Sequence, residues 1–396
     1  MKQDWPTKRL ADVCQILGGA TPSKKNPKFY GGDIPWATVG DMNVEVITTT
    51  EEYITKAAVA DCSTNIIPSG SIVMATRVGL GKVCVLGQDT AINQDLKGLT
   101  PKNHKELTNR WLYWWLKSMA SEIQKAGTGA TVQGVKMTFV QELEIPLPPL
   151  AEQKRVVALL DEAFAGIDEA KANAEVNQSN SDGLYKSYLQ SVFRERGSGW
   201  LDVKLDEVCG FQNGFAFKSN TFRPSGTPVI RISNIQDGII DTENRLVFVN
   251  PKDYRENLDR YRVVEGDLLI AMSGATTGKI GFNTESREFY LNQRVGKFEP
   301  GKRLNKRFLY HFLSTKVEEN LSISAGAAQP NLSTEQIKGF VLPLPPIEDQ
   351  ARIVASIEAL LAEIRQLASL YAEKQLALAG LKNSLLIQAF AGELTA

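Results

Sequence analysis

A proline-rich stretch that occurs twice constrains this 396-residue chain more than any other feature. The copies read Ile145-Pro-Leu-Pro-Pro-Leu-Ala-Glu-Gln153 and Leu342-Pro-Leu-Pro-Pro-Ile-Glu-Asp-Gln350. Proline has a fixed φ and no N–H, so these residues hold an extended approach and are tolerated in a helix only in its first turn. Each copy therefore predicts the start of a helix.

An apolar seam runs along each predicted helix, with spacings of three and four residues. This spacing places side chains on one face that packs on a partner helix. The first seam comprises Val157, Leu160, Phe164, Ile167, Ala174, Tyr185, Tyr188 and Val192, with a polar middle around Lys171, Gln178 and Ser181. The second comprises Val354, Ile357, Leu361, Ile364, Ala368, Tyr371, Leu378 and Leu385. We expect the two helices to pack on each other.

The duplication extends beyond the helices, so an internal repeat is the framework for the fold. Matched pairs, at offsets of 195 or 197 residues, include Trp5 and Trp200, Cys14 and Cys209, Arg110 and Arg307, and Phe193 and Phe390. Nearly the whole chain is therefore two copies of one unit. Each copy is a globular segment followed by a long helix.

Each globular segment predicts a mixture of strands and helices, and hence an α+β fold. In the first segment we expect strands at 34–39, 71–76 and 81–86, the last two forming a hairpin, and an amphipathic helix at 106–125. In the second we expect strands at 227–233 and 266–272 and a helix at 306–315. The predicted domains are 1–148 and 199–345, and the predicted spacer helices are 149–198 and 346–396.

The short linker Arg196-Gly-Ser-Gly199 sets the direction of the two helices. Because the ends of a compact domain tend to lie close together, the first helix should end near the start of the second. The pair is then antiparallel, with an approximate two-fold relation between the copies. At about 1.5 Å per residue, a helix of about 44 residues spans roughly 65 Å.

Together these motifs resemble the specificity subunit of a type I restriction-modification system. The resemblance rests on the paired proline motifs, on the openings Gly18-Gly-Ala-Thr-Pro22 and Gly214-Phe-Ala-Phe-Lys218, and on the closing Ala389-Phe-Ala-Gly-Glu-Leu394. It implies two target recognition domains separated by two long antiparallel coiled-coil helices. Each domain would read one half of a bipartite, asymmetric site in double-stranded DNA.

The resemblance also implies partners that carry the chemistry. They are two modification subunits, which methylate adenine with S-adenosylmethionine, and two restriction subunits, which use ATP and Mg²⁺ to translocate and cleave DNA. This chain itself would bind no cofactor. Two alternatives stay open, namely a specificity subunit of a combined methyltransferase-nuclease system and a coiled-coil adaptor without DNA binding.

The composition fits a non-catalytic cytoplasmic protein. No Asn/Asp-Pro-Pro-aromatic loop of an adenine methyltransferase occurs, and the nearest phosphate-loop pattern, Gly274 to Lys279, has three rather than four residues between its glycines. The isolated cysteines predict neither a metal site nor disulfides. His311 stands where the other copy has Trp114, which favours a packing role. No apolar run of eighteen residues predicts a membrane span.

Charge gives weaker support, because the chain is neutral overall while each globular segment is +2 and each helical segment is −2. The candidate DNA-binding residues are those suited to phosphates or base edges in the diverging loops. In the first domain they are Ser23, Lys24, Lys25, Arg77, Lys82, Asn93 and Gln94. In the second they are Lys218, Arg231, Ser273, Thr276, Lys279, Asn292, Gln293 and Arg294. The two Asn-Gln pairs fit a structural turn as well as a base contact.

Overall fold

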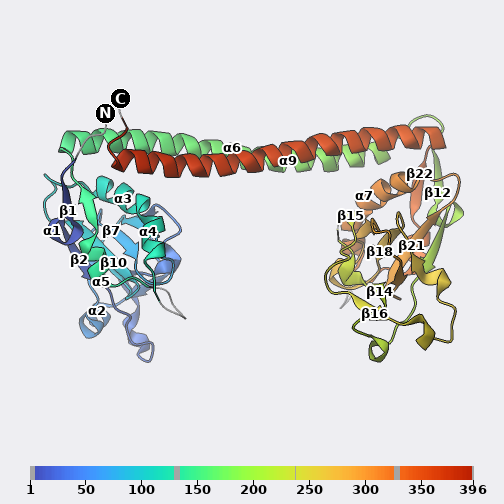
Figure 1. Ribbon diagram of the computed structural model, residues 1–396, viewed down its shortest axis with the longest axis horizontal. Coiled ribbons are helices and arrows are strands. Elements are labelled where there is room, and N and C mark those ends of the chain that lie inside the picture. Colours follow the sequence, from blue (N-terminus) through green and yellow to red (C-terminus); the bar gives the residue numbers. More distant parts are fainter. Residues whose placement is uncertain (1–4, 129–133, 237, 325–330, 395–396) are drawn as a thin grey trace. The chain divides into compact units, whose positions relative to one another are not determined.

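The computed structural model describes residues 5–128, 134–236, 238–324 and 331–394. The chain divides into two compact units, unit 1 formed by Met1–Glu175 with Ala372–Ala396 and unit 2 formed by Val176–Tyr371. Each unit contains one copy of the globular repeat and a part of both long helices (Figure 1). The α+β fold predicted from the repeat is therefore confirmed.

The described part of unit 1 contains three sheets. The five-stranded sheet has the order β2-β10-β7-β8-β4, the four-stranded sheet has the order β5-β3-β9-β6, and β1 pairs with β11. The strands of the larger sheet are β2 (Cys14–Gly18), β10 (Leu96–Pro101), β7 (Ile72–Ala75), β8 (Val83–Leu86) and β4 (Val46–Ile47). The others are β5 (Glu52–Ile54), β3 (Tyr30–Ala37), β9 (Thr90–Ile92), β6 (Ile66–Ile67), β1 (Thr7–Arg9) and β11 (Glu144–Pro146).

Unit 2 repeats this plan strand for strand. Its sheets have the orders β13-β21-β18-β19-β15 and β16-β14-β20-β17, and β12 pairs with β22. The strands of the larger sheet are β13 (Cys209–Asn213), β21 (Val295–Pro300), β18 (Leu268–Ala271), β19 (Ile280–Phe282) and β15 (Gly238–Ile239). The others are β16 (Val247–Val249), β14 (Thr227–Ile230), β20 (Phe289–Leu291), β17 (Arg262–Val263), β12 (Leu201–Lys204) and β22 (Val341–Leu344).

The helices follow the same repeat. In the first copy they are α1 (Leu10–Val13), α2 (Lys56–Cys62), α3 (Asn109–Ser118), α4 (Ala120–Lys125), α5 (Met137–Glu142) and the long α6 (Leu150–Arg194). In the second they are α7 (Lys306–Ser324), α8 (Thr334–Lys338) and the long α9 (Ile347–Phe390). Within the described ranges, no helix is long and apolar enough to cross a bilayer.

Most elements predicted from the sequence are present, with shifted ends. The predicted hairpin is confirmed, because β7 and β8 pair antiparallel with Val73 opposite Cys84. The predicted helix at 106–125 begins only at Asn109, because the Thr108 hydroxyl accepts the Trp111 N–H and caps it there. It is interrupted at Met119 and continues as α4.

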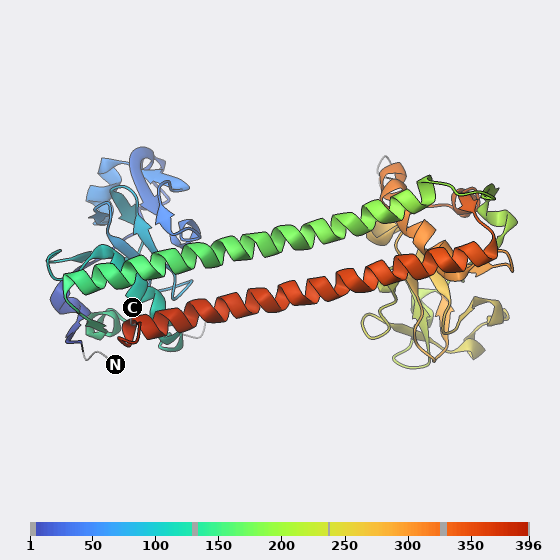
Figure 2. The same cartoon turned by 90° about the horizontal axis from the view of Figure 1, so that it is seen from above.

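The core of unit 1 brings together residues from both ends of the chain. Trp111 of α3 is fully buried, and its ring lies 5.6 Å from that of Trp5 and 4.7 Å from that of Phe390. Within this unit α6 and α9 lie side by side in opposite directions (Figure 2), and Arg155 Nη2 donates to Leu394 O at 2.7 Å. The predicted antiparallel pairing is therefore observed in unit 1.

The predicted helix seam is confirmed through the middle of unit 1 and shifts at its end. Leu160, Phe164, Ile167 and Ala174 are buried, but Val156 is buried where Val157 was predicted, and Leu386 where Leu385 was predicted. Val157 and Leu385 are only partly buried. The shift arises because this end of the helix pair also faces α3, where the Phe164 ring lies 4.6 Å from that of Trp114.

Unit 2 has the equivalent core. Phe308 of α7 replaces Trp111, and its ring lies 5.2 Å from that of Phe193 and 6.2 Å from that of Trp200. The end of α6 thus occupies in unit 2 the place that the end of α9 occupies in unit 1. Val354 and Ile357 of α9 complete this core, as the predicted second seam requires.

The glutamine of each proline motif ties the long helix to its globular segment. Gln153 is fully buried; its Nε2 donates to Glu106 O at 2.7 Å and to Pro148 O at 3.0 Å, and its Oε1 accepts the Thr108 N–H at 3.1 Å. Gln350 makes the same three bonds, to Arg303 O, Pro345 O and Asn305 N–H, at 2.9, 2.9 and 2.7 Å. The repeated motif is therefore a repeated joint.

Candidate nucleic-acid interface

In unit 1 several predicted residues gather where two parallel strands end. β3 and β9 are parallel neighbours, with Ala37 opposite Ile92, and the next residue, Asn93, donates its N–H to Ala37 O at 3.0 Å. The end of β7 reaches the same place, because the Arg77 N–H donates to Asp95 O at 3.3 Å. We call Arg77 together with residues 93–95 the frame edge of unit 1.

The glycine-rich loop that opens the repeat lies against this frame edge. A Cβ at Gly19 would lie 1.9 Å from Ile92 O, so only glycine permits so close an approach. Two residues on, the Thr21 hydroxyl donates to Oε1 of the exposed Gln94. The loop continues into an exposed turn that carries Ser23, Lys24 and Lys25. Both lysines lack a partner among the described residues, which leaves their charges available to a ligand.

The predicted side chains at this edge differ in what they can contact. Arg77 is 52% exposed. Asn93 is 7% exposed, and its Oδ1 accepts the Asp95 N–H at 3.0 Å, so it shapes the turn instead of facing solvent. In the adjoining turn, Lys82 Nζ donates to Asn43 Oδ1 at 2.7 Å.

Unit 2 has the same arrangement with different side chains. β14 and β20 are parallel neighbours, and Asn292 donates its N–H to Ile230 O at 3.1 Å. The end of β18 joins them, because the Met272 N–H donates to Arg294 O at 2.9 Å. We call Ser273 together with residues 292–294 the frame edge of unit 2.

The opening loop of unit 2 makes the equivalent close approach. A Cβ at Gly214 would lie 2.1 Å from Asn292 O, and the Gln293 N–H donates to Phe215 O at 2.9 Å. Gln293 and Lys218 are exposed. The matched glycines of the two openings therefore have one structural cause, which is the packing of the loop on the frame edge.

Other predicted residues of unit 2 bond within the fold. Arg231 Nη2 donates to Arg245 O at 2.7 Å, and the Thr276 hydroxyl donates to Ile232 O at 2.9 Å. Lys279 is partly buried in the turn between β18 and β19, where its carbonyl accepts the Ala271 N–H at 2.9 Å. These residues build the loops beside the frame edge.

Two charged residues at the edge of unit 1 were missed from the sequence. Asp95 forms an ion pair with Arg77, with Nη1 and Oδ1 3.4 Å apart. Lys97 Nζ donates to Gln94 O and Leu96 O, both at 3.2 Å, and burial lowers the pKa of this amine. The one signal that could have found Lys97 is its place between the apolar residues of β10, where a charged side chain must turn toward the edge.

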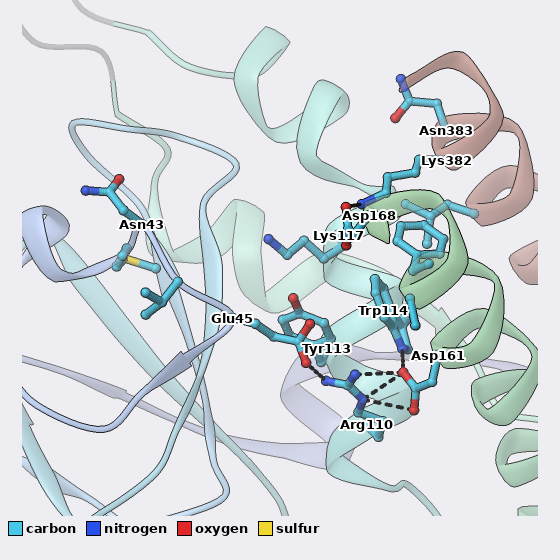
Figure 3. Close-up of a pocket in the computed structure, with 15 residues that line it drawn as sticks. Asn43, Glu45, Arg110, Tyr113, Trp114, Lys117, Asp161, Asp168, Lys382 and Asn383 are labelled. Carbon is cyan, nitrogen blue, oxygen red and sulfur yellow. Dashed lines mark hydrogen bonds and ion pairs between the residues drawn. The ribbon is translucent and has the colours of Figure 1, made fainter. Parts of the chain in front are cut away.

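A group of charged and aromatic residues fixes α3 to α6 in unit 1. The Arg110 guanidinium lies between Glu45 and Asp161, at 2.5 and 2.7 Å, and Trp114 Nε1 donates to Asp161 at 2.8 Å (Figure 3). Burial opposes the charge on Arg110, but the bonds to Asp161 and Glu45 raise its pKa overall. An open pocket of about 640 Å³ lies beside these residues, with Lys117 at its wall.

Unit 2 has a weaker version of this connection. Arg307 Nε and His311 Nε2 both lie 3.8 Å from Glu358 Oε1, at the positions equivalent to Arg110, Trp114 and Asp161. His311 is 1% exposed, as its predicted packing role requires, and neither of its ring nitrogens has a hydrogen-bond partner among the residues that the structure describes. Burial, and then the charge of Arg307, lower the pKa of His311 to about 4.

Comparison with known proteins extends the internal repeat to a family. A model described as "Type I restriction modification DNA specificity domain" matches residues 2–178 and again 197–372. The MjaIX specificity subunit of Methanocaldococcus jannaschii is 25% identical over 368 residues, covering 87% of this chain and 84% of that protein. The EcoR124I/EcoR124II specificity subunit of Escherichia coli is 33% identical over 165 residues, covering 40% of each.

Solved structures share the fold over the whole chain. The HsdS subunit from Thermoanaerobacter tengcongensis aligns with a TM-score of 0.65 at 21% identity, covering 98% of this chain and 97% of that one. A chain from a structure that describes complex assembly and conformational transition of the type I R-M system aligns with a TM-score of 0.78 at 23% identity, covering 98% of both. These structures match the paired units and their long helices.

Proposed function

This chain belongs to the family of type I restriction-modification DNA specificity subunits, and we propose that each of its globular units reads one half of a bipartite, asymmetric DNA target. The chain is the non-catalytic specificity subunit. It acts in DNA sequence recognition, in association with modification and restriction subunits.

The observation that carries the proposal is the repeated frame edge with unlike side chains. In both units the same backbone bonds bring together the ends of two parallel strands, a hairpin turn and the opening loop. The side chains on this common frame differ, with Arg77 and Asp95 in unit 1 against Ser273 and Arg294 in unit 2. A common frame with different side chains fits two domains that bind the same kind of ligand but different sequences of it.

Within this proposal we assign three roles to predicted residues. Three exposed lysines contact phosphates and supply affinity without sequence information, namely Lys24, Lys25 and Lys218, whose ammonium groups have no partner among the described residues. Arg77, Gln94, Gln293 and Arg294 are exposed at the frame edges and read base edges. Asn93, Arg231 and Thr276 hold the loops that present them.

We further propose that two modification subunits bind the helix pair and that two restriction subunits complete the assembly. The internal repeat supports this number, because it offers two equivalent sites to two copies of one partner. The long helices also expose apolar side chains that nothing in the described chain covers, namely Leu159, Val176, Leu184, Leu367, Leu370, Leu376, Leu381 and Ile387. Such surfaces mark contacts with partner proteins.

The proposal is tested by measuring DNA binding by the complex of this chain with its modification subunit. We expect sequence-specific binding whose affinity falls steeply with salt. The logarithm of the affinity should fall by about 0.9 per phosphate contacted for each unit of the logarithm of salt concentration. The double variant Lys24→Ala/Lys25→Ala should weaken binding to every sequence and lower this slope by about 2. Lys105→Ala, at an exposed position of the loop before α3, is the matched control. Equal affinity of the wild-type complex for all sequences would refute the proposal.

A further inference from the structure

The two frame edges each carry one arginine, but at different positions. In unit 1 Arg77 follows β7, and in unit 2 Arg294 precedes β21. The strand pairs make Arg77 equivalent to Ser273 and Asp95 equivalent to Arg294, because Ala75 lies opposite Leu96 as Ala271 lies opposite Val295. Unit 1 therefore has a carboxylate where unit 2 has a guanidinium.

The carboxylate of Asp95 is held in place by the turn around it. The backbone N–H of Asp95 donates to Asn93 Oδ1 at 3.0 Å, and Oδ2 of the Asp95 side chain accepts a hydrogen bond from Asn93 Nδ2 at 3.4 Å. The side chain is only 18% exposed, whereas that of Arg77 is 52% exposed. Asp95 is thus held by its turn while Arg77 is exposed, and the ion pair draws the guanidinium to one side of the edge.

Arg77 forms an ion pair with this carboxylate, whose charge also acts on the neighbouring Lys97. Lys97, the other cation at the edge, donates to the carbonyl oxygens of Gln94 and Leu96. Gln94, which is adjacent to Asp95 in the sequence, is exposed, and its Oε1 accepts a hydrogen bond from the Thr21 hydroxyl. An arginine that pairs with a carboxylate through one of its N–H groups still has its other N–H donors available to bind a ligand.

We infer that Asp95 is a positioning residue for Arg77, and that Arg77 reads a guanine in the first half-site. This inference rests on the proposed function. A guanidinium reads guanine O6 and N7 with two parallel hydrogen bonds, which require a defined orientation. Holding the side chain before DNA binds lowers the cost of ordering it on binding. In unit 2 the exposed Arg294 makes the equivalent contact, and no carboxylate among the described residues pairs with it.

Methylation-site profiling of the complex with its modification subunit tests this inference, with Asp95→Asn, Arg77→Ala and Arg294→Ala as variants. Arg77→Ala should lower the preference for guanine at one position of the first half-site by about 5- to 150-fold, the value of one bidentate contact. Asp95→Asn keeps the shape of the side chain but weakens its charge interaction, so it should lower the preference at the same position by about 3- to 10-fold. Arg77→Ala and Asp95→Asn should both leave the second half-site unchanged, which makes it an internal control.

Arg294→Ala should give the reciprocal result, with a relaxed second half-site and an unchanged first one. Thermal unfolding should be the same for Asp95→Asn and the wild type, which separates positioning from a structural role. An unchanged profile in Asp95→Asn overturns the inference. The inference is also overturned if Arg77→Ala weakens binding to all DNA sequences equally and lowers the slope of log affinity against log salt concentration by about 0.9. That result would mean that Arg77 contacts a phosphate. A wild-type complex without any sequence preference would instead refute the proposed function.

Discussion

Replacing Gln153 with leucine removes the joint between the first long helix and its globular segment. Leucine has a similar volume but cannot pair with the two carbonyl oxygens and the N–H that the amide now satisfies. Each buried polar group left unpaired costs about 1 to 3 kcal/mol. Because some of these groups can still reach water, we expect the free energy of unfolding of unit 1 to fall by about 3 to 5 kcal/mol.

This loss is large enough to measure by calorimetry. For a unit of this size about 1 kcal/mol corresponds to about 2 to 4 °C, so the transition of unit 1 should move down by about 6 to 20 °C. Hydrogen exchange should also accelerate at the start of α3, because Gln153 fixes the N–H of its capping residue, Thr108. Gln350→Leu should do the same to unit 2.

Gln366→Leu is the matched control, since Gln366 is an exposed glutamine of α9. It should leave both transitions in place. If Gln153→Leu unfolds within about 2 °C of the wild type and α3 exchanges as before, the three bonds do not act as a joint and the reasoning is refuted.

Four further predictions concern pH, recognition, spacing and ligands. Unit 2 should lose stability as the pH falls from 6.5 to about 4, by up to about 1.4 kcal/mol per pH unit. The reason is that His311 takes up a proton in the unfolded chain at a higher pH than it does when buried in the folded unit. Urea titrations of His311→Phe should not show this loss. Exchanging residues 1–148 for the domain of another specificity subunit should change one half of the methylated site, and a change in both halves would refute independent reading. We expect the helices to lengthen by roughly 6 Å when about four residues are inserted near Gln178 and at the facing position of α9. The preferred DNA spacer should then grow by one to two base pairs. An unchanged spacer would show that the helices do not set its length. Calorimetric titration of the purified chain with S-adenosylmethionine or ATP should give no saturable binding, and a one-site isotherm would contradict this.

Local constraints made much of the fold predictable from the sequence. The prolines fix the backbone before each long helix, and α6 and α9 begin at Leu150 and Ile347, directly after them. The repeat then applies one plan to both units, including the burial of Cys14 and Cys209 at matched positions. The helix seam was predicted one residue out of place at Val157, because periodicity alone does not reveal that α3 packs against the same turns.

The candidate interface was less predictable, because it depends on which strands are neighbours. Residue type alone marked Arg77, but its partner Asp95 lies in the turn before β10 and is found only through the pairing of β7 with β10. Conversely, Arg231 and Thr276 have side chains suited to DNA, yet nearby carbonyl oxygens engage both. Those carbonyl oxygens are placed by loops whose conformation no local pattern in the sequence specifies.

The packing of Phe390 on Trp111 sets an order for folding during synthesis. All segments of unit 2 lie between residues 176 and 371, so its core can close while residues 372–396 are still being made. Unit 1 lacks Leu386, Ala389 and Phe390 until the end of α9 has left the ribosome, and the bond from Arg155 to Leu394 O joins residues 239 positions apart. Contacts of such long sequence separation form late. Of the two units, unit 1 is therefore completed after unit 2, although its globular segment is translated before that of unit 2, and until then α3 exposes the apolar surface that α9 will cover.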